Sequence, residues 1–185
     1  FEGCFTTHAG IKMFNRRCEE ALLAAETMCA LAHVDRNTEL REAWTRVLFN
    51  HFHDIFDGAA VHDAYINAFE RAELSLKDAE EATEQAVRKL VKPAAGGRFL
   101  NVFNSLGMAR SGPVLFKLPK TTACLTDGAG NPVATQKYGD ETLFISEDVP
   151  AFSYRTYELG NKKPEGLDET PVSVQEEDGF FRVET

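Results

Sequence analysis

The first half of the chain repeats its apolar residues every three or four positions, which places them along one side of an α-helix. Three such stripes follow one another before Pro93. They comprise Ile11, Phe14, Cys18, Leu22, Ala25, Cys29 and Ala32; Leu40, Trp44, Val47, Leu48, His51, Phe52 and Ile55; and Val61, Tyr65, Phe69, Ala72, Leu76, Ala79, Thr83, Ala86 and Leu90. Because the connections are short, neighbouring helices are expected to run antiparallel. The pattern predicts a three-helix bundle, with Thr6 or Thr7 as the first N-cap.

The second half follows a different pattern, with a period of two in short runs of β-branched and aromatic residues. The runs cover residues 99–103, 114–118, 123–125, 133–138, 142–145, 154–159, 172–175 and 180–183. All seven prolines and ten of the thirteen glycines lie from Pro93 onward, so turn residues separate the runs. We therefore predict an α+β chain. An antiparallel three-helix bundle (1–95) precedes an antiparallel β-sandwich-like region (96–185) that is incomplete.

Charge and composition exclude some classes of partner. The 185 residues include 20 lysines and arginines against 29 aspartates and glutamates, a net charge of −9, so we expect no nucleic-acid binding. Apolar runs stay well short of the ~20 residues that span a bilayer, and no signal peptide is recognisable at the start. The four cysteines form no Cys-x-x-Cys pair, which favours thiols in a reducing compartment.

The densest candidate chemistry lies at the end of the second helical stripe, where His51, His53 and Asp54 are followed by Asp57. Imidazole and carboxylate groups are zinc ligands, and a catalytic zinc takes three protein ligands. Residues two apart on a helix point roughly 200° apart, so at most one of the two histidines is a ligand unless the helix breaks. The alternative is hydrogen-bonded capping of a helix C-terminus. A second His-x-Asp segment, 33–35, is interpreted as a helix end.

Four segments together resemble the glycoside hydrolase family 38 α-mannosidases. Residues 49–63 (FNHFHDIFDGAAVHD) resemble the family's His-Asp-Ile turn, and residues 3–19 its Gly-x-aromatic-Thr start of the middle helical domain. Residues 102–106 (VFNSL) and 149–157 (VPAFSYRTY) resemble two motifs of its β-rich region. The segments occur in the family's order along nearly the whole chain. Departures from the usual residues are Asp57, Ala59, Ala60, Ser105, Met108 and Ser153.

The resemblance implies a retaining exo-α-mannosidase that uses zinc to bind the terminal sugar of a mannoside. It makes His53 a zinc ligand and Asp54 a neighbour that contacts the sugar or supports the site. In the family the other ligands, the nucleophile and the acid/base carboxylate lie in an amino-terminal α/β domain, which this sequence does not contain. We therefore expect a fragment that is inactive alone, from a bacterial cytoplasmic enzyme.

A non-catalytic module is the competing hypothesis, in which the helices and strands serve as a scaffold or an interaction module for a partner protein. Indifference to zinc would favour this alternative. The sequence assigns no role to His51, His62 or Asp57, and it leaves open the sugar linkage, the aglycone and the oligomeric state.

Overall fold

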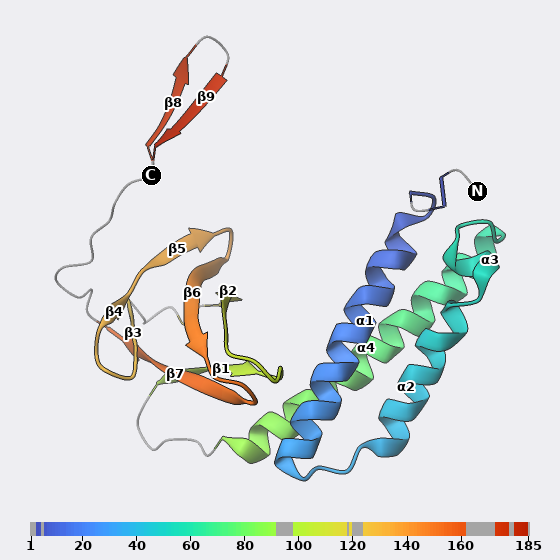
Figure 1. Ribbon diagram of the computed structural model, residues 1–185, viewed down its shortest axis with the longest axis horizontal. Coiled ribbons are helices and arrows are strands. Elements are labelled where there is room, and N and C mark those ends of the chain that lie inside the picture. The colour runs from blue at the N-terminus through green and yellow to red at the C-terminus, as the bar shows by residue number, and fades with distance from the viewer. Residues whose placement is uncertain are drawn as a thin grey trace. The chain divides into compact units, whose positions relative to one another are not determined.

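The chain forms two compact units, Phe1–Pro93 and Ala94–Thr185 (Figure 1). The computed structural model describes residues 3–4, 6–91, 98–117, 119, 124–161, 173–177 and 180–184. The first unit is helical and the second consists of antiparallel strands, so the predicted α+β class is confirmed. Within these described ranges, no helix is long and apolar enough to cross a membrane.

The helical unit contains three long helices and one short one. They are α1 (Ala9–Ala32), α2 (Asn37–Asn50), α3 (His53–Phe56) and α4 (His62–Leu90). Both α1 and α2 pack against α4, and the three long helices lie side by side in Figure 1. Three main helices were predicted correctly. The second apolar stripe, however, is not one helix, because it is divided after Asn50 into α2 and α3.

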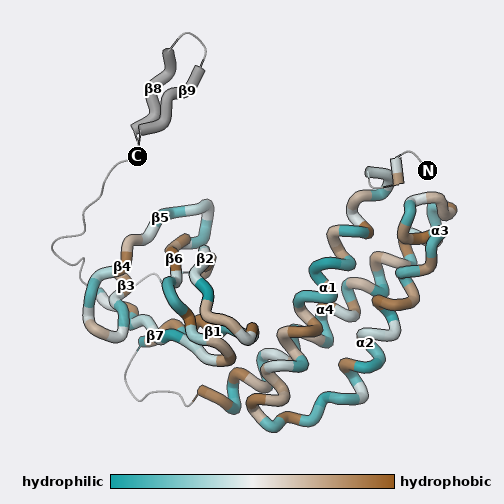
Figure 2. Tube along the Cα trace, in the orientation of Figure 1, coloured by the Kyte–Doolittle hydropathy of each residue, from teal (hydrophilic) through white to brown (hydrophobic). Residues whose placement is uncertain are grey.

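The core of this unit is built from small side chains on α4 that face larger ones on α1. Apolar and polar residues alternate along each helix (Figure 2). The first stripe is buried as predicted, except that Phe14 is only partly buried. The buried residues of α4 are Tyr65, Ala68, Ala72, Ser75, Ala79, Ala82 and Ala86, whereas Leu76 and Thr83 are only partly buried. Small residues at a helix contact let two axes approach closely, so the alanines determine how tightly α1 packs.

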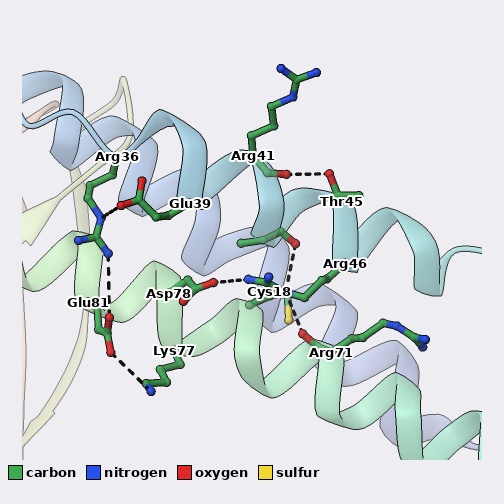
Figure 3. Close-up of polar contacts among 12 residues, drawn as sticks. Cys18, Arg36, Glu39, Arg41, Thr45, Arg46, Arg71, Lys77, Asp78 and Glu81 are labelled. Carbon is green, nitrogen blue, oxygen red and sulfur yellow. Dashed lines mark hydrogen bonds and ion pairs between the residues drawn. The ribbon is translucent and has the colours of Figure 1, made fainter.

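Ion pairs connect α2 to α4 beside this core (Figure 3). Arg46 pairs with Asp78, and the Arg36 guanidinium lies 4.0 Å from a Glu81 carboxylate oxygen. The remaining glutamates of α4 are exposed at positions 70, 73, 80 and 84, as expected for a solvated face. Asp78 and Glu81 of α4 therefore pair with arginines, and the other four glutamates face solvent.

The ends of α1 depend on residues in the left-handed region. His8 precedes α1 with φ +46°, and His33 follows it with φ +51°. The predicted N-cap is wrong, because the hydroxyls of Thr6 and Thr7 donate to the Gly3 carbonyl instead, at 3.1 and 2.8 Å. The interpretation of 33–35 as a helix end is confirmed.

The described strands of the second unit form two antiparallel sheets and one further antiparallel pair. The first sheet has the order β1 (Phe99–Asn104), β7 (Ser153–Gly160), β3 (Cys124–Thr126) and β4 (Pro132–Val133). The second has the order β2 (Arg110–Phe116), β6 (Glu141–Val149) and β5 (Thr135–Tyr138), and β8 (Ser173–Glu177) pairs with β9 (Phe180–Glu184). Leu125, Phe144 and Tyr157 bring both sheets into one hydrophobic core.

The strands differ from the predicted runs in several places, and β2 begins at Arg110, four residues before the predicted start. The run 133–138 is divided at Ala134, since β4 joins one sheet and β5 the other. β6 continues to Val149, four residues beyond the predicted end. Residues 118, 123 and 172, at the ends of three predicted runs, lie outside the described part of the chain. The pairing of strands across two sheets therefore decided boundaries that local alternation could not.

Asn104 organises the loops at the end of β1. Its side-chain amide nitrogen lies within hydrogen-bond distance of the carbonyls of Met108, Val149 and Pro150, at 2.7 to 3.1 Å. Its carbonyl oxygen accepts the Leu106 N–H at 3.0 Å. The asparagine of the VFN motif is thus buried for structural reasons, because it satisfies backbone groups of the loop after β1 and of the end of β6.

Candidate metal-ligating segment

The segment that carries His53 begins where α2 ends. Asn50 is buried, and its side-chain amide donates to the Ala68 carbonyl of α4 at 2.8 Å. The next two amides bond three residues back instead of four, His51 to Leu48 and Phe52 to Phe49. Phe52 then takes an extended conformation, with φ −52° and ψ 130°, and α3 starts at His53. The helix therefore breaks between the two histidines.

This break sends the two imidazoles to different surroundings. His51 turns toward α1, where its Nε2 lies 2.6 Å from the Asn15 Oδ1. The side chain of His53 is 77% exposed, and its Nε2 lies 3.2 Å from an Asp54 carboxylate oxygen. The Phe52 ring lies beside it, with the ring centroids 4.5 Å apart. The His53 imidazole is the more exposed of the two, since the side chain of His51 is 37% exposed.

Ile55 anchors the short helix α3 to the rest of the bundle. It is buried in a cluster with Ile11, Tyr65 and Ala68, which come from α1 and α4. The neighbours of Ile55 in α3 are His53, Asp54 and Phe56. With Ile55 buried, the side chains of His53 and Asp54 are exposed to solvent. A single apolar residue thus determines which side of α3 faces solvent.

The loop between α3 and α4 is held by polar contacts and by a glycine. The Asp57 carboxylate accepts the Ala59 N–H at 2.9 Å, and the Tyr65 hydroxyl accepts the Ala60 N–H at 3.1 Å. Gly58 has φ +99°, and a Cβ there would lie 2.7 to 2.9 Å from atoms of Thr7. Asp57 therefore shapes the loop, a role that the sequence did not assign.

His8 supports the same loop from the amino-terminal side. Its ring stacks on Tyr65 with centroids 3.8 Å apart and planes 10° from parallel. His62, the first residue of α4, is exposed. The stack gives His8 a structural role. Tyr65 was missed as a support of the loop, and its place in an apolar stripe indicated only that it would be buried.

The described residues include two neighbouring side chains of zinc-ligand type. Among them, no group of three or more His, Cys, Asp and Glu side chains is placed to hold a metal ion. His53 and Asp54 nevertheless offer an imidazole and a carboxylate, which are zinc-ligand types, on an accessible surface. Burial raises the pKa of the Cys18 thiol to about 11 and also raises the pKa of Cys29, so neither favours a thiolate ligand. The donor set fits zinc if other ligands come from outside these residues.

Comparisons with known proteins point to one family. Residues 1–90 match the family model described as the alpha mannosidase middle domain. Alpha-mannosidase 2C1 of Mus musculus is 27% identical over 124 residues, which are 64% of this chain and 12% of that protein. Alpha-mannosidase 2C1 of Homo sapiens is 35% identical over 65 residues, 32% of this chain and 6% of that protein.

Solved structures share the fold. A glycosyl hydrolase family 38 protein from Enterococcus faecalis matches with a TM-score of 0.64 and 17% identity, over 89% of this chain and 26% of that one. An alpha-mannosidase from Enterococcus faecalis V583 matches with a TM-score of 0.56 and 18% identity, over 85% and 22%.

The helical bundle with its His-Asp turn is an alpha mannosidase middle domain, and antiparallel sheets follow it in the chain. The chain belongs to the glycoside hydrolase family 38 α-mannosidases, with residues 1–90 as its alpha mannosidase middle domain. It spans 12% and 6% of the two curated relatives and about a quarter of the two solved chains.

Proposed function

We propose that this chain is part of a zinc-dependent retaining exo-α-mannosidase that hydrolyses terminal α-mannosides. The observation that carries the proposal is the accessible His53–Asp54 pair at the helix break of a domain that matches the α-mannosidase middle domain. Residues 1–95 are the helical domain of this enzyme, and residues 96–185 are the start of its β-rich domain. The enzyme acts in the bacterial cytoplasm.

His53 is the zinc ligand that this chain contributes. Its imidazole is exposed, and Ile55 and Asn50 hold the backbone on both sides of it. Asp54 supports the imidazole through the 3.2 Å contact, and its side chain is 56% exposed, so it also reaches a sugar hydroxyl. A bound zinc supplies Lewis-acid stabilisation of charge at the hydroxyls of the terminal sugar.

The carboxylates that cleave the glycosidic bond belong to another part of the polypeptide. Retention of configuration requires a nucleophile and an acid/base carboxyl group about 5 to 5.5 Å apart. We place both groups, and the remaining zinc ligands, in an amino-terminal α/β domain outside this chain. His53 and Asp54 bind and orient the sugar, and the chain alone is inactive.

The test uses the longer polypeptide that carries this chain, purified with zinc bound. We expect His53→Ala to lower zinc content and to reduce hydrolysis of an aryl α-mannoside at least about 100-fold, because an open catalytic site has few ligands to lose. His62→Ala is the matched control, since this exposed histidine lies outside the His53–Asp54 pair.

Two results would contradict the proposal. One is turnover of the aryl mannoside by the 185-residue chain alone, since the chain would then need no other domain. The other is unchanged zinc content and activity in His53→Ala, which would favour the scaffold hypothesis.

A further inference from the structure

His51 connects the helix break to α1 through a short network of polar side chains. Its Nε2 lies 2.6 Å from the Asn15 Oδ1, and the Asn15 amide nitrogen donates to a Glu19 carboxylate oxygen at 2.9 Å. Glu19 in turn pairs with Arg16 at 2.7 Å. Since the Asn15 nitrogen is engaged with Glu19, its oxygen is the acceptor and His51 donates from Nε2. We call His51, Asn15 and Glu19 the α1 lock.

The same imidazole also contacts α3. The ring of His51 lies against Phe56, with centroids 5.5 Å apart and planes tilted by 56°. His51 therefore touches α1 with one ring nitrogen and α3 with its ring surface, while its own backbone caps α2. It is placed to determine the angle at which α3 leaves α2.

That angle decides where His53 lies. In an unbroken helix the two histidines would differ by roughly 200° in direction, and the side chain at 53 would be placed by α2 alone. Here the chain extends at Phe52 and α3 begins anew, so the position of His53 depends on what holds α3. The α1 lock holds α3 through the contact of His51 with Phe56. The buried Ile55 holds α3 against the core of the helical unit.

We propose that His51 is a positioning residue for the metal-ligating segment, acting through the α1 lock to fix α3 and thereby the imidazole of His53. The proposal rests on the proposed function of His53 as a ligand. Ligand geometry tolerates only small displacements, so loosening α3 weakens metal binding without removing a ligand. His51 acts through its Nε2 contact with Asn15 and not as a ligand in this proposal.

The first experiment measures the zinc dissociation constant of the longer polypeptide by competition with a chromophoric chelator. We expect His51→Ala and Asn15→Ala each to weaken zinc binding about tenfold, the lower range for groups that orient a ligand. The double variant should be no weaker than either single variant, because both remove the same bond. His51→Gln, which keeps an N–H donor, should restore most of the affinity, and His62→Ala should have no effect.

The second experiment needs no metal and no turnover. In the metal-free protein, His51→Ala should speed hydrogen exchange at the α3 amides of Ile55, Phe56 and Asp57, which bond to Phe52 and His53 carbonyls. Exchange in the middle of α1 and α4 should stay unchanged. A general loss of stability would instead speed exchange in all helices, and that result would overturn the positioning role.

The two proposals fail in different ways. If His53→Ala removes zinc while His51→Ala and Asn15→Ala leave both zinc affinity and α3 exchange unchanged, His51 has no positioning role and the proposed function stands. If His53→Ala leaves zinc affinity unchanged, the proposed function falls and the positioning proposal falls with it.

Discussion

At the scale of single residues, the helical core buries two cysteine thiols next to backbone carbonyls of α4. The Sγ atoms of Cys18 and Cys29 lie 3.4 and 3.6 Å from the carbonyls of Ala72 and Ala82 on α4. Both side chains are buried, and loss of hydration favours the neutral thiol over the thiolate. Burial is the largest cause of the raised pKa of Cys18, and it outweighs the opposing charge of Arg17.

This shift predicts a pH dependence of stability. The folded pKa of Cys18 is about 11 and its ordinary value is 9.0, so folded protein keeps a proton that unfolded protein loses. The stabilisation is fully present below pH 9 and is lost as the pH rises toward 11, by about 2 kcal/mol. The loss of unfolding free energy can be measured by chemical denaturation at several pH values, monitored by the fluorescence of Trp44, the single tryptophan.

The variant Cys18→Ala isolates this effect from other groups that titrate in the same range. Its free energy of unfolding should fall less steeply between pH 9 and 11 than that of the parent chain. Equal slopes would show that the Cys18 thiol has the same pKa in the folded and the unfolded protein.

At the scale of elements, the division between α2 and α3 is the feature that local sequence did not predict. His51, Phe52 and Ile55 continue the helical spacing of the second stripe, so the hydrophobic period passes through the break unchanged. The break depends on Asn50, whose bond to α4 is a contact between residues 18 positions apart. Periodicity reports which residues are apolar, and it does not report which helix a polar side chain will reach.

The loop after α3 predicts a sharp cost for one substitution. Gly58→Ala places a methyl group within 2.9 Å of Thr7 at a φ of +99°, a conformation that alanine rarely adopts. We expect the variant to lose about 2 kcal/mol of stability, measured as a lowered midpoint of thermal unfolding by circular dichroism.

Gly128→Ala is the matched control, because a Cβ there meets no atom within 4 Å. It should leave the thermal midpoint nearly unchanged. If Gly58→Ala behaved like this control, the contact between Thr7 and the loop would not constrain the fold.

At the scale of the whole molecule, each unit has its own core. The helical unit packs α1 and α2 on the small residues of α4, and the second unit surrounds Leu125, Phe144 and Tyr157. A unit with its own hydrophobic core is able to fold alone.

We therefore predict that residues 1–91 fold without the strands. The isolated polypeptide should give a helical far-ultraviolet spectrum and a single cooperative thermal transition. Leu22→Asp, which buries a charge at a fully buried position, should abolish both. A spectrum of an unfolded chain for residues 1–91 would mean that the strands are required for helix packing.

The sequence by itself determined the α+β class, the three long helices, most core positions of α1 and the family motif that contains His53. These follow from local period, turn residues and short motifs, which need no knowledge of distant contacts. Helical spacing alone left either His51 or His53 as the candidate ligand, and the family resemblance selected His53.

Only the tertiary structure shows how the surroundings of the two imidazoles come to differ. Asn50 reaches α4, His51 reaches Asn15 on α1, and Ile55 enters a core formed by residues far along the chain. Contacts between distant residues also determined the strand boundaries. β4 and β5 are separate strands because β4 pairs within one sheet and β5 within the other. Hydrogen bonds and burial between distant residues select among conformations that local sequence leaves nearly equal in energy. They hold the His51 imidazole against Asn15 of α1 and leave that of His53 more exposed to solvent.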